Sequence, residues 1–217
     1  MRVALFDMDG TLVRKNTAAL YIRYEYEIGR AQLSQVLRVL WWRARYWLGQ
    51  IEAEQIVAQA LRWYAGRSEA ELRRELPPWF ERYVKPHISD AARRAVREHQ
   101  QRGDVTAIVS SSTPYITDLV AEELGIEHVI CSRLSVCDGV LSGEVELPLC
   151  YGPGKVLLAQ RWLETMAEQA GLERATAYGD SITDLPLLEA VEQPVAVNPD
   201  PSLLCRALAR GWTIQRW

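Results

Sequence analysis

The sequence predicts an α/β fold, in which a Rossmann-like parallel sheet carries helices on both faces and an all-helical cap follows the first strand. Two patterns lead to this prediction. The short apolar run Val3–Phe6 is typical of a buried parallel strand. From Ile88 onward, helical and strand-like segments alternate, as they do in a parallel sheet covered by helices. We therefore place the core at residues 1–15 and 86–217 and the cap at residues 16–85.

The composition is that of a folded globular protein. The chain has 217 residues, of which 48% are hydrophobic, which is enough to bury a sizeable core. The formal net charge of −3 argues against a general nucleic-acid binder, which would carry a surplus of basic side chains. The four cysteines follow no metal-ligand spacing, and no signal peptide precedes the first strand. We therefore expect reduced thiols and a cytoplasmic protein.

Two carboxylates, Asp7 and Asp9, come directly after the first predicted strand, ahead of the turn Gly10-Thr11. In open α/β sheets, ligands bind outside the carboxyl ends of the strands, so these carboxylates are candidates for chemistry. Alternation along an extended chain would point both in the same direction, about 6 to 7 Å apart. One carboxylate could then attack while the other shuttles protons. The simpler interpretation is a solvated turn, since Asp and Gly are common in turns.

Helical patterns fill the segment between Asn16 and Tyr83, and no convincing strand lies there. Asn16 or Thr17 can cap a first helix that runs toward Ile28. Three further helices are predicted, and Pro86 is expected to close the last of them: Gln32–Leu48, Glu52–Ala65 and Ser68–Arg82. The prediction is an all-helical insert of about 70 residues.

The predicted helix Gln32–Leu48 mixes aromatic with basic side chains. Its aromatic residues are Trp41, Trp42, Tyr46 and Trp47, and its basic residues are Arg38, Arg43 and Arg45. Such a helix can lie on a membrane surface. We favour the simpler interpretation, in which the tryptophans pack the helical insert and the arginines are solvated.

A second polar turn follows the next predicted strand of the core. A helix at residues 89–102 precedes the predicted strand Val105–Val109. This strand leads into the hydroxyl-rich segment Ser110–Thr113, and Pro114 opens the following helix. Backbone N–H groups and the helix dipole make such a turn a natural anion site.

The next region delivers one lysine to the start of a helix. After a strand at His128–Cys131, the pattern predicts a hairpin of Leu134–Cys137 and Val140–Val145. A glycine-rich loop then places Lys155, one of three lysines in the chain, at the beginning of a helix that reaches Ala170. A compact ammonium group suits a phosphoryl oxygen, although a surface lysine is the simpler interpretation.

A third polar turn follows the predicted strand Ala175–Tyr178. It contributes two more carboxylates, Asp180 and Asp184. Asp184 could act only as a helix cap, but polar residues at three strand ends indicate a single site at the carboxyl edge of the sheet. The chain closes with a strand at Val195–Val197, a turn at Asn198–Pro201, a helix at Leu203–Ala209 and a short strand at Trp212–Ile214.

Taken in order, these motifs resemble those of the haloacid dehalogenase-like superfamily of phosphohydrolases. The motifs are Asp7-Met8-Asp9-Gly10-Thr11, Ser110 at a strand end, Lys155, and Gly179-Asp180-Ser181 with Asp184. The helical insert and the residues around Ser110 and Lys155 resemble the phosphoserine phosphatase-like branch. The resemblance covers nearly the whole chain.

The resemblance implies a mechanism and a role for each motif residue. Asp7 would attack phosphorus and form an aspartyl phosphate, while Asp9 would act as general acid and base. Mg²⁺ would be held by Asp7, the main-chain carbonyl of Asp9, and Asp180. The remaining motif residues would bind the phosphoryl group or, for the last of them, orient the lysine or a metal-bound water: Ser110, Ser111, Lys155 and Asp184.

The implied activity is hydrolysis of a small phosphomonoester. Two other interpretations stay open: a phosphotransferase that passes the phosphoryl group to an acceptor alcohol, and a non-catalytic protein that docks on a membrane or partner through the Trp-rich helix. The sequence predicts no nucleic-acid partner and no transmembrane segment, since no apolar run reaches roughly 18 residues. It determines neither the substrate nor the oligomeric state.

Overall fold

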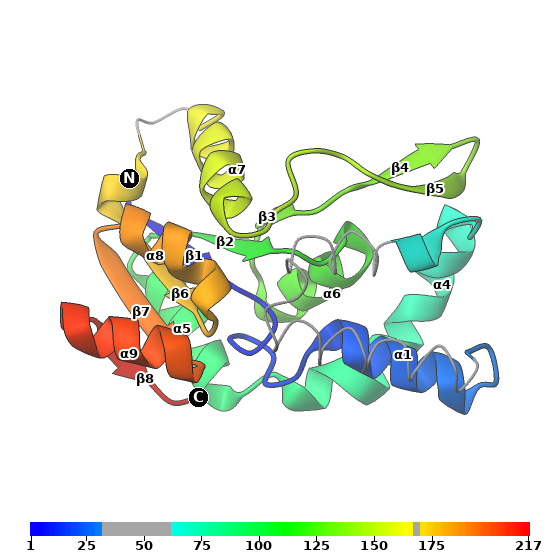
Figure 1. The fold of residues 1–217 in the computed structure, drawn as a ribbon, viewed down its shortest axis with the longest axis horizontal. Helices are drawn as coiled ribbons and strands as arrows, with labels where there is room; N and C mark the ends of the chain where they lie inside the picture. Colours follow the sequence, from blue (N-terminus) through cyan, green and yellow to red (C-terminus); the bar gives the residue numbers. More distant parts are fainter. Residues whose placement is uncertain (32–61, 167–169) are drawn as a thin grey trace.

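The computed structural model describes residues 1–31, 62–166 and 170–217 (Figure 1). Their core is a six-stranded parallel sheet with the strand order β3-β2-β1-β6-β7-β8. In chain order the strands are β1 Val3–Phe6, β2 Val105–Ser110, β3 His128–Cys131, β6 Ala175–Gly179, β7 Gln193–Val197 and β8 Thr213–Gln215. This sheet and its helices confirm the predicted α/β fold class.

The strand β1 lies in the middle of the sheet and is buried along its whole length. Ala4 and Phe6 join one hydrophobic cluster, whereas Val3 and Leu5 join a second one. Because both faces of the strand are covered, the segment is a continuous apolar run rather than an alternating one. The strand is therefore a rigid support for the residues that follow it.

Helices cover both faces of the sheet (Figure 1). The first cluster includes side chains of α5 (Asp90–Gln101) and α6 (Pro114–Leu124). The second includes side chains of α7 (Pro153–Glu164), α8 (Leu185–Ala190) and α9 (Pro201–Arg210). The two layers of helices leave the carboxyl ends of the strands as the edge where a ligand can bind.

The helix α7 is shorter than predicted, because it ends at Glu164 rather than at Ala170. The hydroxyl of Thr165 donates a hydrogen bond to the carbonyl of Trp162 at 2.6 Å. Such a local bond competes with continuation of the helix. Residues 167–169 lie outside the described part of the chain.

Between β1 and α5, the described elements are all helical: α1 Thr17–Glu27, η1 Arg62–Tyr64, α4 Glu69–Trp79, η2 Phe80–Val84 and η3 Lys85–His87. The predicted helix Gln32–Leu48, with its tryptophans, and most of the predicted helix Glu52–Ala65 lie outside the described residues. The boundaries between core and cap at residues 15/16 and 85/86 stay a prediction.

The sequence predicts that the last helix of this insert stops at Arg82, but the helical path extends beyond this residue. After α4 the chain continues through the π-helical turn η2 and the 3₁₀ turn η3 to His87. The change of hydrogen-bonding pattern follows Pro77 and Pro78, which lack N–H donors. Pro86 does not end the helical path, because a proline is tolerated in the first turn of a helical segment.

The predicted hairpin is present and consists of β4 (Leu134–Cys137) and β5 (Val140–Val145). It extends away from the main sheet toward α4 (Figure 1). The Gly66 N–H donates to the Leu141 carbonyl at 2.8 Å, and the Leu141 N–H donates to the Arg67 carbonyl at 2.9 Å. The hairpin therefore links the core to the helical insert.

Within the described ranges, no helix is long and apolar enough to cross a membrane. All four cysteines are free thiols. Cys131 and Cys150 are buried, whereas Cys137 and Cys205 are exposed.

Candidate active site

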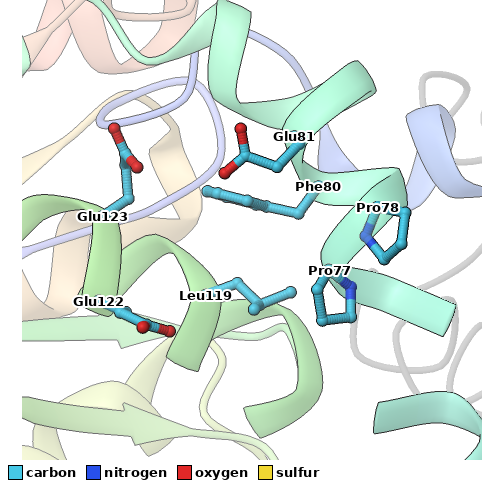
Figure 2. Close-up of a pocket in the computed structure, with 7 residues that line it drawn as sticks. All are labelled: Pro77, Pro78, Phe80, Glu81, Leu119, Glu122 and Glu123. Carbon is cyan, nitrogen blue, oxygen red and sulfur yellow. The ribbon is translucent and has the colours of Figure 1, made fainter. Parts of the chain in front are cut away.

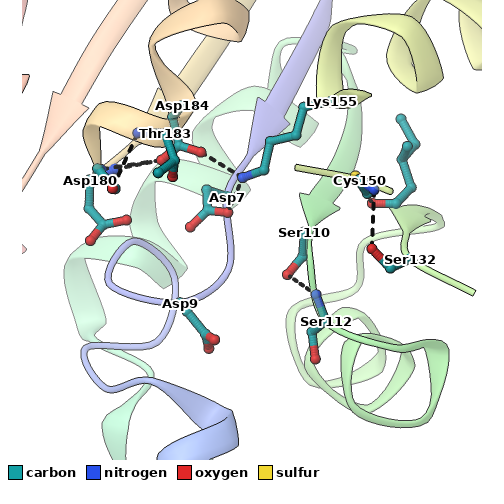
Figure 3. Close-up of polar contacts among 12 residues, drawn as sticks. Asp7, Asp9, Ser110, Ser112, Ser132, Cys150, Lys155, Asp180, Thr183 and Asp184 are labelled. Atoms are coloured by element: carbon teal, nitrogen blue, oxygen red, sulfur yellow. Dashed lines mark hydrogen bonds and ion pairs between the residues drawn. The ribbon is translucent and has the colours of Figure 1, made fainter. Parts of the chain in front are cut away.

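Lys155 lies between two carboxylates at the carboxyl edge of the sheet (Figure 3). Its Nζ donates to Asp7 Oδ1 at 2.5 Å and to Asp184 Oδ1 at 2.6 Å. All three side chains are buried. They come from the end of β1, the first turn of α7 and the turn after β6. The structure therefore brings together three predicted site residues that are far apart in the sequence.

The charge of Lys155 is fixed by its surroundings. Burial opposes an ammonium charge, but the nearby carboxylates of Asp184 and Asp7 outweigh burial and raise the pKa of Lys155. The side chain is 4% exposed, so bulk water screens this charge very little. Lys155 is therefore a permanent cation inside the site.

Asp184 binds both Lys155 and the backbone of the turn at Asp180 and Ser181. Its Oδ2 accepts from the N–H of Asp180 at 3.2 Å and from the N–H of Ser181 at 3.3 Å. A Cβ at Gly179 would lie 2.7 Å from this oxygen, so the close approach requires glycine there. Since Oδ1 accepts from Lys155, both carboxylate oxygens of Asp184 are engaged.

Asp180 directly follows β6, and Asp7 directly follows the neighbouring strand β1. The strands β1 and β6 pair in parallel with Phe6 opposite Tyr178, so their two acidic turns begin side by side. One oxygen each of Asp7, Asp180 and Asp184 lies within 4.8 Å of the others. No donor among the described residues hydrogen-bonds the Asp180 carboxylate. This carboxylate is therefore available to a ligand.

Three carboxylates share one ammonium group in this cluster. Burial and then repulsion from Asp7 and Asp184 raise the pKa of Asp180. Burial also raises the pKa of Asp7, although Lys155 opposes this rise. With all three carboxylates ionised, the cluster would carry more negative charge than Lys155 neutralises, and a bound divalent cation would supply the missing positive charge.

The available oxygens fit Mg²⁺, which prefers oxygen ligands and is held by only one or two carboxylates in many sites. Asp7 Oδ2 and the Asp180 carboxylate accept no hydrogen bond from the described residues, whereas both oxygens of Asp184 do. Asp7 and Asp180 are therefore the better ligands, with Asp184 orienting Lys155. The contribution expected from the main-chain carbonyl of Asp9 stays a prediction.

Gly10 lies against the carboxylate of Asp180. Its φ is +84°, and a Cβ there would lie 2.1 Å from Asp180 Oδ2. We expect Gly10→Ala to displace this carboxylate and to lower turnover by about 10- to 100-fold, the usual effect of disturbing the position of a metal ligand. Steady-state turnover and urea unfolding measure the effect.

Gly29→Ala is the matched control for Gly10→Ala. Gly29 has a similar φ of +74°, but no atom of the described residues lies within 4 Å of its Cβ position. Both variants should lose about 1 to 2 kcal/mol of stability to the left-handed conformation, Gly10→Ala more than Gly29→Ala because its Cβ also overlaps the Asp180 carboxylate, and only Gly10→Ala should lose turnover. Equal turnover by the two variants would contradict the assigned contact.

Asp9 does not point in the same direction as Asp7, contrary to the expectation from strand alternation (Figure 3). The strand β1 ends at Phe6, so its alternation does not extend to Asp9. Asp9 Oδ1 accepts from the Thr17 N–H at 3.0 Å, and Oδ2 accepts from the Thr17 hydroxyl at 3.2 Å. Asp9 therefore joins the first acidic turn to the start of α1.

The surroundings of Asp9 suit a group that exchanges protons. Burial raises the pKa of Asp9 to about 6, and the hydrogen bonds from Thr17 limit this rise. A carboxyl group with such a pKa holds or releases a proton near neutral pH. The carboxylate oxygens of Asp9 do not belong to the cluster formed by Asp7, Asp180 and Asp184.

The hydroxyl-rich turn lies at the end of β2, the strand on the other side of β1. Ser110 is buried, and its hydroxyl accepts from the Ser112 N–H at 3.2 Å. Ser111 is partly exposed in the same turn, and Thr113 is the N-cap of α6. Ser110 and Asp7 thus face the same edge of the sheet (Figure 3), while phosphate binding by Ser110 and Ser111 stays a prediction.

A groove of about 540 Å³ lies between the helical insert and α6 (Figure 2). Four apolar side chains and three glutamates line it: Pro77, Pro78, Phe80, Leu119, Glu81, Glu122 and Glu123. Lys85 pairs with Glu81 at 2.9 Å and with Glu123 at 3.1 Å, which compensates much of the acidic charge. The groove contains none of the motif residues, so it is separate from the carboxylate cluster.

Two residues that the sequence motifs do not include contact the acidic turns. Asn198 donates to the Gly10 carbonyl at 3.3 Å, and Asp200 accepts from the Ile182 N–H at 2.8 Å. Both follow β7, where the sequence indicates only a turn. The signal that could have found them is the one used for the other motifs, namely polar residues at the carboxyl end of a buried strand.

Comparison with known proteins agrees with this geometry. The family model described as haloacid dehalogenase-like hydrolase matches residues 4–189. The chain is 30% identical to a histidinol-phosphatase of Neisseria meningitidis serogroup C, over 98% of this chain and 97% of that protein. It is 31% identical to the phosphoserine phosphatase SerB1 of Mycobacterium tuberculosis, over 98% of this chain and 70% of that protein.

A solved structure is also similar along nearly the whole chain. It is a protein of unknown function from Bordetella pertussis Tohama I, with a TM-score of 0.85 and 32% sequence identity, covering 99% of this chain and 97% of that one.

The family match, together with the parallel sheet and the acidic turns at its carboxyl edge, identifies an α/β hydrolytic enzyme. The chain belongs to the haloacid dehalogenase-like hydrolase family. Within that family it is a member of the phosphoserine phosphatase-like branch. The expected resemblance is thereby confirmed.

Proposed function

We propose that this protein is a Mg²⁺-dependent phosphatase that hydrolyses a small phosphomonoester through an aspartyl phosphate. The observation that supports this proposal most strongly is the buried contact of Lys155 with Asp7 at 2.5 Å. It places a permanent cation beside a carboxylate that has one oxygen free. A carboxylate can attack an anionic phosphate only if nearby positive charge offsets their repulsion.

Asp7 is the nucleophile in this proposal. One carboxylate oxygen forms a bond to phosphorus as the bond from phosphorus to the ester oxygen breaks, and the leaving group departs as an alcohol or alkoxide. Water then attacks the phosphorus of the aspartyl phosphate and releases inorganic phosphate and the Asp7 carboxylate. Two displacements replace one slower hydrolysis.

Asp9 is the general acid and then the general base. It gives a proton to the departing alkoxide and takes one from the attacking water. In the conformation described here, its carboxylate is bound to Thr17 at the start of α1, so it has to turn toward Asp7. We propose that the insert of residues 16–85 is a cap whose closure over the substrate accompanies this turn and excludes water.

The other residues neutralise and position the phosphoryl group. Lys155, the Ser110 hydroxyl and the turn of Ser111 would contact its oxygens. Asp7, the Asp9 carbonyl and Asp180 would hold Mg²⁺, which when bound neutralises charge on the transferring phosphoryl group. Asp184 keeps Lys155 aimed at Asp7, since it binds the same Nζ at 2.6 Å.

Removal of the metal tests the first part of this proposal. Dialysis against a chelator should abolish the release of phosphate from 4-nitrophenyl phosphate, and excess MgCl₂ should restore it, because among the described residues Lys155 is the one ammonium group shared by Asp7, Asp180 and Asp184, and a divalent cation is needed to offset the remaining negative charge. Full turnover in the chelated enzyme would contradict metal dependence. A phosphorylated alcohol formed when acceptor alcohols are added would identify a phosphotransferase instead.

The substrate class follows from the site and from the relatives. The histidinol-phosphatase and phosphoserine phosphatase relatives both have names that denote removal of phosphate from small molecules. Measuring turnover of phosphoserine, histidinol phosphate and lysophosphatidate shows which of these small phosphomonoesters the protein hydrolyses. Activity on a small ester with no activity on larger phosphorylated substrates is the expected outcome.

A further inference from the structure

The loop after β7 contacts both acidic turns of the site. Asn198, at the end of this strand, has a positive φ of 45° and uses its side chain as a bridge. Its Nδ2 donates to the Gly10 carbonyl at 3.3 Å, and its Oδ1 accepts from the Trp217 N–H at 2.9 Å. The turn that carries Asp7 and Asp9 is therefore tied to the neighbouring loop at Gly10.

Asp200 makes three connections from the same loop. Its N–H donates to the Asp180 carbonyl at 2.7 Å. Its Oδ2 accepts from the Ile182 N–H at 2.8 Å, and its Oδ1 accepts from the Leu203 N–H at 2.8 Å. One carboxylate thus joins the turn of Asp180 to the first turn of α9.

These contacts matter because the two acidic turns touch each other. The space beside Gly10 is filled by the carboxylate of Asp180, which leaves no room for even a methyl group. A small shift of either turn would change the separation of Asp7 and Asp180. Only the backbone around Asp180 is held by Asp200, so the carboxylate of Asp180 stays free for a ligand.

We propose that Asp200 is a positioning residue for the divalent-cation site, acting through the backbone of Asp180 and Ile182, with Asn198 holding Gly10 on the opposite side. This inference rests on the proposed metal-dependent function. Residues that orient metal ligands typically contribute about 10- to 100-fold to metal affinity. Asp200 also caps α9, so the test has to separate capping from positioning.

Two substitutions at Asp200 separate its capping of α9 from its positioning of the Asp180 turn. Asp200→Ser keeps one side-chain oxygen for the Leu203 N–H, since serine is a good N-cap, but it lacks the second oxygen that reaches Ile182. Asp200→Glu keeps the negative charge but moves it by one methylene group. Ser89→Ala is the control for a lost helix cap elsewhere, because the Ser89 hydroxyl accepts from the Ala92 N–H at 3.0 Å in α5.

The experiment measures the binding of Mn²⁺ to the metal-free protein. Electron paramagnetic resonance detects this binding as a loss of the free-ion signal. We expect the dissociation constant to rise about tenfold in both Asp200→Ser and Asp200→Glu and to stay unchanged in Ser89→Ala. Excess MgCl₂ should restore much of the turnover of the two Asp200 variants, with the KM for the ester little changed.

Each other outcome overturns the inference. Unchanged affinity in Asp200→Ser would mean that Asp200 only caps α9. A loss in Asp200→Ser but not in Asp200→Glu would mean that charge alone matters. Failure of the wild-type protein to bind Mn²⁺ or to hydrolyse the ester would instead refute the proposed function, which separates the two failures.

Discussion

Asp7→Asn is expected to lower turnover of a small phosphomonoester by at least about 10⁴-fold, as loss of a nucleophile does in other covalent mechanisms. An amide keeps the size of the side chain but is a very poor nucleophile. Lys155 keeps its second partner, Asp184, at 2.6 Å, so the rest of the site should stay in place.

The same variant should be no less stable than the wild type. Burial raises the pKa of Asp7, which means that the folded protein holds the ionised carboxylate less readily than the unfolded chain does. This unfavourable contribution is absent below the pKa of the unfolded carboxyl, grows as the pH rises toward the folded pKa, and is complete above it. Removing the carboxylate should therefore maintain or increase the free energy of unfolding at pH 8 in metal-free buffer.

The control for Asp7→Asn is Asp138→Asn. Asp138 is exposed in the hairpin turn at a φ of 49°, a conformation that asparagine also accepts. Turnover and thermal unfolding of both variants provide the comparison. If Asp7→Asn retained turnover within tenfold of the wild type, Asp7 would not be the nucleophile.

Lys155→Met should impair both stability and activity. It leaves Asp7 and Asp184 buried without their shared cation, and breaking such a buried pair costs about 3 to 5 kcal/mol. The pKa of Lys155 is raised in the folded state, so the lysine itself stays charged below the pKa of an unfolded lysine, which includes the whole range from pH 5 to 9. Turnover should fall by about 10²- to 10³-fold.

The stability loss in Lys155→Met should shrink as the pH is lowered. Protonation of the carboxylates left behind removes their mutual repulsion, so urea unfolding at pH 5 should show a smaller difference from the wild type than at pH 8. Lys85→Met is the control, since Lys85 forms only solvent-accessible ion pairs with Glu81 and Glu123 and should change stability far less than Lys155→Met does. Equal losses in the two variants would argue against a special role for the buried lysine.

The sequence predicted the sheet and the position of most site residues because both depend on local patterns. A fully buried parallel strand is a short apolar run, as Val3–Phe6 is, and its carboxyl end is marked by the first polar residue. Parallel strands end at one edge, so Asp7, Ser110 and Asp184 could be expected together without knowledge of their distances, whereas Lys155, at the start of a helix, was expected there only from the family resemblance. The structure adds the hydrogen bonds that fix them.

Other features depend on contacts that a linear pattern does not contain. The direction of Asp9 is set by Thr17 at the start of α1, and the period of a strand says nothing about a carboxylate beyond the strand end. The helical path to His87 depends on how the chain passes Pro77 and Pro78. The role inferred for Asp200 depends on the backbone of a turn from another strand.

The most direct test of the proposed mechanism is the reaction of Asp9→Asn with 4-nitrophenyl phosphate. The 4-nitrophenolate leaving group departs without a proton from a general acid. Hydrolysis of the aspartyl phosphate, in contrast, needs Asp9 to activate water. Mixing should give a rapid burst of nitrophenolate equal to the amount of enzyme, and acid-quenched protein should carry a phosphoryl group on the peptide that contains Asp7. Absence of a burst together with unlabelled protein, or a phosphoryl group on any other residue, would contradict covalent catalysis by Asp7.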